Sequence, residues 1–198
     1  MKTLVTDKHR RRQLVNLYFK YILISFLCCY VICINAFASI SIPPSKMLYQ
    51  ISKQKNKAER FAKDLCDHYK GRTQDSNFLE AVKLYTDAES ASNALIDTAK
   101  FNLDAGRKGD IYQQYNVLSK DALYRSEKFI AYVEELVYDQ RSGDNFISYL
   151  VSGALEPFTD AYIKIHNYHS NVDKEKKDEI KRMLDECKWK PFNKICPR

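Results

Sequence analysis

Apolar residues recur every three or four positions along most of this chain, as they do in helices that bury one face. The period runs through four long segments, at residues 45–69, 77–104, 110–139 and 144–168. A shorter periodic segment follows, from Asn171 or Asp173 to Cys187. The 198 residues include only five glycines and five prolines. Because turn-forming residues are scarce, the pattern predicts long helices and not a many-stranded sheet.

Residues that cap helices stand at the starts of these segments. Ser45 precedes the first, Asp75 or Ser76 the second, and Asp144 the fourth. Each side chain can accept a hydrogen bond from an N–H of the first turn. Pro157 lies inside the fourth segment and should kink that helix, because proline has no N–H to donate. Short joins between four long helices predict an all-α fold, an antiparallel up-down four-helix bundle with an N-terminal helical extension and a short C-terminal helix.

The middle of the first segment is unusually charged. Residues 53–60 read KQKNKAER, with one small apolar side chain among seven polar ones. Charged side chains are seldom buried without a partner. We therefore expect the early turns of this helix to project beyond the core.

The N-terminal residues have the order of a secretory signal peptide. Basic residues, including Lys20, precede an apolar run from Tyr21 to Ala36, and small residues stand at Ala36 and Ala38. The apolar run is shorter than the roughly 20 residues of a membrane-spanning helix. Cleavage after Ala38 is thus favoured over an uncleaved signal anchor. The predicted organisation is a signal peptide at 1–38, a linker at 39–46 and a helical domain at 47–198, in a protein secreted to the extracellular space.

Cleavage changes the charge of the protein. Residues 1–38 carry six basic side chains against Asp7 alone, so their removal lowers the formal net charge from +7 to +2. A mixed surface near +2 does not favour nucleic-acid binding, which needs a clustered basic face. Membrane association is expected only if the N-terminal segment is not cleaved.

Three cysteines remain after cleavage, which allow one disulfide and one free thiol in an oxidising compartment. The local pair Cys187 and Cys196 is the preferred bridge, because Pro191 helps the intervening chain turn back. The alternative is a bridge from Cys66 to the C-terminal region. The other three cysteines lie in the apolar run of the signal segment, at Cys28, Cys29 and Cys33.

No sequence motif of catalysis stands out in the chain. It lacks GxSxG, P-loop, HExxH and Rossmann glycine patterns, so we predict a non-enzymatic protein without a cofactor. His166 and His169 stand three residues apart, but no third ligand has a fitting spacing, and no metal site is predicted.

An aromatic and basic cluster lies near the C-terminus and is a candidate contact for a protein partner. It consists of Trp189, Lys190 and Phe192. Tryptophan is a frequent anchor of protein interfaces. The alternative is that this segment is a strap packed against the bundle.

The stretch from Ser119 to Tyr168 resembles the plant pectin methylesterase inhibitor and invertase inhibitor family. Ala122-Leu123 and the run 129–136 are similar to the pattern of that family's third helix. Residues 150–155, LVSGAL, are similar to the pattern of its fourth helix. The resemblance implies a secreted four-helix bundle preceded by a small helical hairpin. It also implies steric inhibition of a cell-wall carbohydrate-active enzyme, a pectin methylesterase or an invertase, in the apoplast.

The family disulfide between the third and fourth helices has no counterpart here. Its cysteine positions fall on Arg125 or Ser126 and on Ala161. These two helices are therefore expected to lie side by side without a covalent link. The alternative function is a secreted helical signalling or effector protein that binds a receptor or a host protein.

Overall fold

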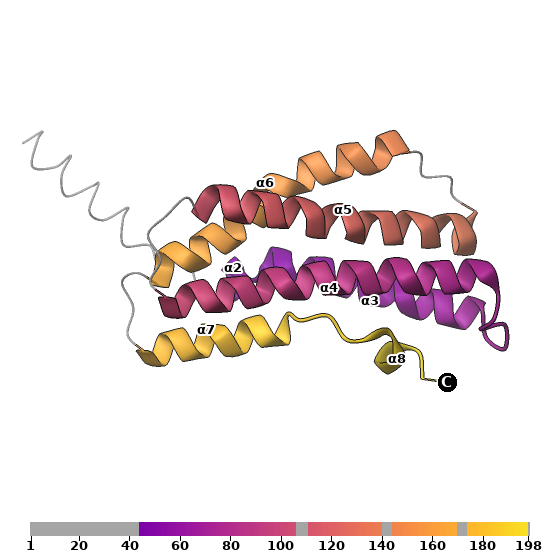
Figure 1. Ribbon diagram of the computed structural model, residues 1–198, viewed down its shortest axis with the longest axis horizontal. Coiled ribbons are helices and arrows are strands. Elements are labelled where there is room, and N and C mark those ends of the chain that lie inside the picture. The colour runs from indigo at the N-terminus through magenta and orange to yellow at the C-terminus, as the bar shows by residue number, and fades with distance from the viewer. Residues whose placement is uncertain (1–43, 106–110, 140–143, 170–173, 198) are drawn as a thin grey trace, which may run out of the picture. The chain divides into compact units, whose positions relative to one another are not determined.

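The computed structural model describes residues 44–105, 111–139, 144–169 and 174–197, and these residues are mostly helical. The helices of these residues, α2 to α8, pack against one another (Figure 1). Residues Pro43–Arg198 form one unit, which begins a few residues before the predicted domain boundary. The predicted signal peptide, with Ala36 and Ala38, lies outside the described residues. In the described part of the chain, no helix has the length and apolarity needed to cross a membrane.

The first predicted helix forms as two pieces, α2 (Pro44–Met47) and α3 (Tyr49–His68). The interruption is at Leu48, which is buried, and the Ser52 N–H still donates to the Leu48 carbonyl at 2.9 Å. Ser45 is a residue of α2, so its predicted role as an N-cap is wrong. The predicted linker accordingly ends before Pro44.

The next two helices agree with the predicted ranges within one residue at each end. They are α4 (Ser76–Ala105) and α5 (Ile111–Tyr138). Asp75 caps α4, as one of the two predicted candidates, because its Oδ1 accepts the Asn77 N–H at 2.9 Å. Gly71 provides the left-handed backbone that the turn before α4 needs, with φ at +78°.

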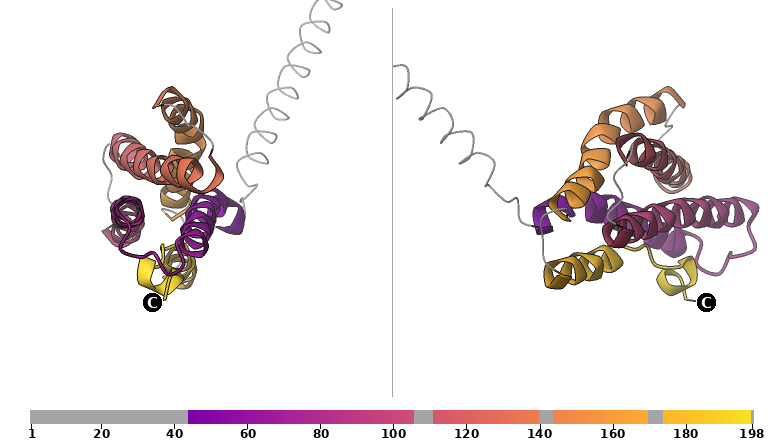
Figure 2. Two further views of the ribbon diagram at one scale, coloured as in Figure 1. Left: turned by 90° about the vertical axis from the view of Figure 1, so that its right-hand side faces the viewer. Right: turned by 60° about the vertical axis from the view of Figure 1, so that its left-hand side comes forward.

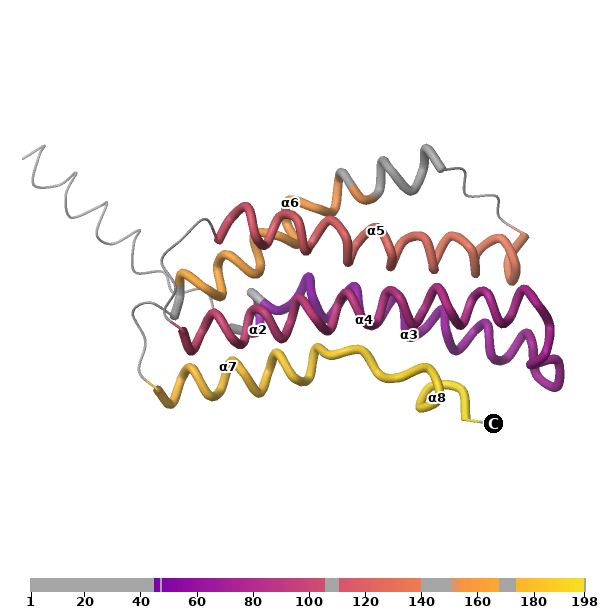
Figure 3. Tube along the Cα trace, viewed as in Figure 1, coloured from indigo at the N-terminus to yellow at the C-terminus, as the bar shows by residue number. Residues whose placement is uncertain are grey.

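The fourth long helix, α6 (Asp144–His169), continues through Pro157. It crosses behind α5 in Figure 1, and the right-hand view of Figure 2 shows that it is bent, as expected for a helix that contains proline. The C-terminal helices are α7 (Lys174–Glu186) and the single turn α8 (Phe192–Ile195). Figure 3 follows the chain from α7 past α4 to α8.

The interior consists of two groups of buried side chains along the helices. One group joins the C-terminal half of α4 to the first half of α5, the second half of α6 and α7. The other joins α3, the first half of α4 and the second half of α5. The largest fully buried side chains are Tyr85, Tyr115, Phe129, Tyr162, Leu65, Leu95, Ile96, Leu123, Ile130, Ile165, Ile180 and Leu184.

Helix α3 packs along its whole length, and the prediction that its early turns project beyond the core is wrong. Buried residues run from Ile51 to Leu65, and α3 contacts α4, α5, α6 and α8. Its charged middle has partners in the rest of the fold: the Lys55 Nζ donates to the Glu186 carbonyl at 2.6 Å. Lys57 pairs with Glu127 at 3.0 Å.

Candidate functional site

A groove of about 580 Å³ opens between α3, α5 and α6. We call it the α3–α6 groove. Its α3 wall is polar, because the charged middle of that helix faces it. The residues of this wall are Gln50, Lys53, Gln54, Asn56, Lys57 and Arg60.

The other walls are apolar apart from one carboxylate. Leu123 and Glu127 come from α5, one turn apart, and Ala154 and Phe158 come from α6 with the same spacing. The apolar side chains pack against the core, so they form a firm floor. The groove therefore combines an apolar floor with a rim that is mainly basic.

Glu127 is the buried charge of the groove, with 5 % of its surface exposed. Its Oε2 lies 3.0 Å from the Lys57 Nζ, and its Oε1 accepts a hydrogen bond from the Gln54 Nε2 at 3.2 Å. Both carboxylate oxygens thus have a partner on α3, which offsets the free-energy cost of burying the charge. The contact connects α3 to α5 and leaves Glu127 with little capacity to bind a further cation.

The sequence analysis missed Glu127, although the helical period contains a signal for it. Glu127 is four residues after the buried Leu123 and three before the buried Ile130, so it falls on the apolar stripe of α5. A charged residue on such a stripe requires a partner. The identity of that partner, on a helix 70 residues earlier, depends on the tertiary fold.

The residues of the predicted partner contact near the C-terminus differ in their burial, and Trp189 lies in the interior. Trp189 is only 4 % exposed, and its ring centroid lies 5.6 Å from that of Tyr85. Phe192 packs at 5.4 Å from the same ring. The burial of Trp189 agrees with the alternative of a packed strap, whereas Phe192 is only partly buried. Lys190 remains exposed, with its Nζ 3.7 Å from the Glu59 Oε2.

Polar contacts hold this C-terminal strap, which we define as residues 187–197. The Asn93 Oδ1 accepts the Trp189 N–H at 2.8 Å, and the Asn93 Nδ2 donates to the Trp189 carbonyl at 3.2 Å. The Tyr85 hydroxyl donates to the Lys190 carbonyl at 2.8 Å. These side chains satisfy backbone groups that an extended segment cannot satisfy by itself.

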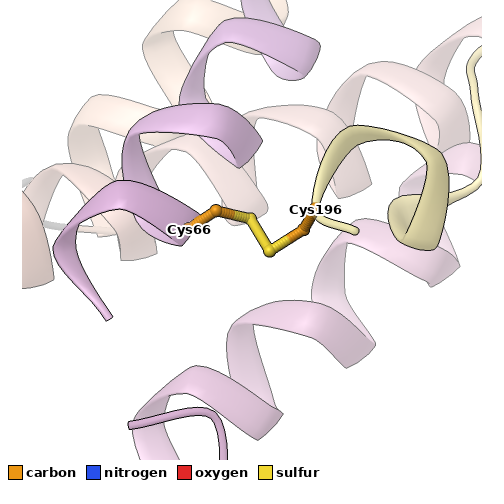
Figure 4. The surroundings of a disulfide bond; sticks show 2 residues. All are labelled: Cys66 and Cys196. Carbon is orange, nitrogen blue, oxygen red and sulfur yellow. A yellow bond between two sulfur atoms is a disulfide. The ribbon is translucent and has the colours of Figure 1, made fainter. Parts of the chain in front are cut away.

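A disulfide closes the strap onto α3. It joins Cys66 to Cys196, with the Cα atoms 5.9 Å apart (Figure 4). The preferred pair of Cys187 with Cys196 is wrong, and the structure has the alternative that begins at Cys66. The physical reason is burial: Cys187 is 4 % exposed at the end of α7, and the strap carries Cys196 away from it to the surface of α3. Burial raises the pKa of the Cys187 thiol, which disfavours the reactive thiolate.

A polar cluster of Asn102, Tyr115 and Tyr162 lies inside the core, between α4, α5 and α6. The Asn102 Nδ2 donates to the Tyr115 hydroxyl oxygen at 3.1 Å, and the Tyr115 ring stacks on Tyr162 at 5.6 Å. Burial raises the pKa of both tyrosines. Both hydroxyls therefore stay protonated at neutral pH, and neither is suited to act as a base.

Among the described residues, no group of three or more His, Cys, Asp or Glu side chains is placed to hold a metal ion. The sequence predicted no metal site at His166 and His169. The side chain of His169 lies outside what the structure describes.

Comparison with protein-family models, with curated proteins and with solved structures found no match to this chain.

Proposed function

We propose that this chain is a secreted, non-catalytic helical protein that acts by binding a protein partner. The observation that carries the proposal is the Cys66–Cys196 disulfide, which holds the C-terminal strap on α3. Disulfides form and persist in oxidising compartments such as the extracellular space. A bridge that joins distant parts of a helical domain also favours a rigid surface, and rigidity lowers the entropy lost on binding.

The proposed architecture is an antiparallel up-down four-helix bundle made of α3, α4, α5 and α6. Short connections support it, since 69–75, 106–110 and 139–143 are the only residues between successive helices. The most extensive helix contacts are those between sequence neighbours, α4 with α5 and α5 with α6. In this arrangement α7 and α8 form the C-terminal addition.

One form of the proposal is an inhibitor of a cell-wall enzyme, as the resemblance of residues 119–168 implies. Helices α5 and α6 contact each other, which agrees with the pairing of the family's third and fourth helices. The packing of α3 weighs against this form. The family resemblance implies an N-terminal hairpin that leans out from the bundle, whereas the apolar face of α3 is buried from Ile51 to Leu65.

The other form is a signalling or effector protein that binds a receptor or a host protein. The full-length packing of α3 favours it, because such a protein needs no projecting hairpin. The absence of a covalent link between Ser126 and Ala161, both buried, is also natural in a bundle of another kind.

Secretion and inhibition can be measured separately. N-terminal sequencing of secreted protein should find a start at Ser39, and retention of residues 1–38 would overturn the predicted cleavage. Stoichiometric assays against a pectin methylesterase and an acid invertase test the inhibitor form. If neither enzyme is inhibited or bound, that form is excluded. Saturable binding of labelled protein to intact cells, displaced by unlabelled protein, is then the expected result for the second form.

A further inference from the structure

We propose that the α3–α6 groove is the docking site for an acidic amphipathic helix of a protein partner. This inference rests on the proposed binding function and names the kind of partner and the surface that it uses. Three observations carry it: the length of the groove, its apolar floor and the uncompensated charge on its rim.

The groove has the dimensions of a helix-binding surface. Its α3 wall extends over the eleven residues from Gln50 to Arg60, which corresponds to about 15 Å along a helix axis or nearly three turns. The wall residues Gln50, Gln54, Lys57 and Arg60 succeed one another at spacings of four and three, so they form a continuous stripe. A second helix laid along this stripe would face the groove with residues i, i+4 and i+7, which is the usual pattern of helix-in-groove recognition.

The floor supplies the apolar contact. Leu123, Ala154 and Phe158 line it, and Ala154 is the small residue that leaves room for side chains of a partner. A helix with two or three apolar residues on one face can place them over this floor. Burial of such side chains supplies most of the affinity in complexes of this kind.

The rim determines the charge of the partner. Lys57 is neutralised by Glu127. In the described part of the chain, neither Lys53 nor Arg60 has a carboxylate within ion-pair distance. The Arg60 guanidinium instead lies 5.2 Å from the centroid of the Phe61 ring, a contact that leaves its N–H donors available. Carboxylates on the polar edge of a docked helix would pair with these two cations.

The N-terminal segment of this same chain does not fit the groove as well. Residues 1–38 carry five more basic than acidic side chains, so their charge has the same sign as the rim. Charges of like sign brought together oppose association. Complementarity therefore points to an acidic segment from another protein.

The test is a display selection with the purified protein, its disulfide intact. The probe is a library of 14-residue helical peptides in which apolar and charged positions are both randomised. The expected result is enrichment of peptides with a negative net charge and apolar residues at i, i+3 or i+4, and i+7. Enrichment of basic or unpatterned peptides, or no enrichment, would overturn the proposal.

A charge-reversal pair locates the binding site. Lys53→Glu with Arg60→Glu should weaken the enriched peptide at least about tenfold, as measured by fluorescence polarisation at low salt. The matched control is Lys83→Glu with Lys128→Glu, which changes the net charge equally at exposed positions away from the α3–α6 groove. Ala154→Phe fills the floor and should also weaken binding, while circular dichroism reports whether each variant stays folded. An equal effect of the control pair, or no effect of the groove variants, would refute the site.

Two further measurements separate other occupants of the groove. Flotation with vesicles containing 30 % phosphatidylglycerol tests an anionic lipid surface, and analytical ultracentrifugation tests a second copy of this chain. Groove-dependent binding of vesicles or groove-dependent dimerisation would replace the proposed occupant. Absence of both, together with selection of acidic helices, supports it. Failure of secretion would count against the proposed function but would not change the result of the peptide selection. Failure of the proposed function and failure of the proposed docking site are therefore distinguishable.

Discussion

Replacing Cys196 with serine should lower the free energy of unfolding by up to about 5 kcal/mol. The bridge joins residues 130 positions apart, so it restricts most of the unfolded chain. The chain-entropy relation for a loop of this length gives about 17 cal/mol/K, or about 5 kcal/mol at 25 °C. For a domain of this size, each kcal/mol changes the melting temperature by about 2–4 °C. The expected loss is thus about 10–20 °C.

The measurement is urea unfolding observed with two probes. Far-ultraviolet circular dichroism reports the helices, and fluorescence reports Trp189, which is the chain's single tryptophan and lies in the strap. Both transitions should coincide in the wild type. In the Cys196→Ser variant the fluorescence transition should come first, because the strap then depends on its side-chain contacts alone. Adding a reductant to the wild type should reproduce the loss and leave the variant unchanged.

Cys187→Ala is the matched control, since it removes a cysteine but keeps the bridge. It deletes one small buried group and should cost only about 1–2 kcal/mol. Peptide mapping without reduction should recover a Cys66–Cys196 link. A Cys187–Cys196 link, or a wild-type midpoint that is insensitive to reductant, would contradict this prediction.

Three other predictions concern buried side chains. Trp189→Ala should destabilise the protein by about 3–5 kcal/mol, measured by calorimetry, since the ring is buried against Tyr85. Glu127→Leu should lower the free energy of unfolding less than Lys57→Leu does, because the second change leaves a buried carboxylate without its cation. Urea unfolding midpoints would show the reverse order if Glu127 were solvated. The free energy of unfolding should fall as the pH rises above about 10, because burial raises the pKa of Tyr162 and this tyrosine loses its proton first in the unfolded chain. Titration at 295 nm should show ionisation of Tyr162 only with unfolding.

The helices of this fold can be predicted from the sequence because they depend on the local pattern of apolar and capping residues. The ends of α4 and α5 follow from the three- and four-residue period, and Asp75 caps α4 as its side chain predicts. Local rules were insufficient at Leu48. That residue fits the apolar period and is buried, yet the regular helix is interrupted there.

The disulfide and the strap depend on contacts between distant residues, which a local pattern does not contain. Closeness in the sequence favoured Cys187 as the partner of Cys196. The strap, however, is held by Asn93 and Tyr85, on a helix about 100 residues earlier, and this path brings Cys196 to Cys66. An aromatic and basic cluster has the same composition whether it packs inside or binds a partner, so composition could not decide the role of Trp189.

The charged middle of α3 shows how the strap and the groove are related. The local sequence pattern predicts that its charges are solvent-exposed, but in the fold they form polar contacts on two sides of the helix. Glu59 accepts the Lys190 N–H of the strap at 3.1 Å, while Lys57 reaches Glu127 across the groove. Helix α3 is therefore held by polar contacts as well as by its apolar face, which explains why a segment with so few apolar residues packs along its full length. Lys55 donates to a backbone carbonyl, whereas Lys53 and Arg60 have no carboxylate within ion-pair distance in the described fold. Both of these cations border the proposed docking site.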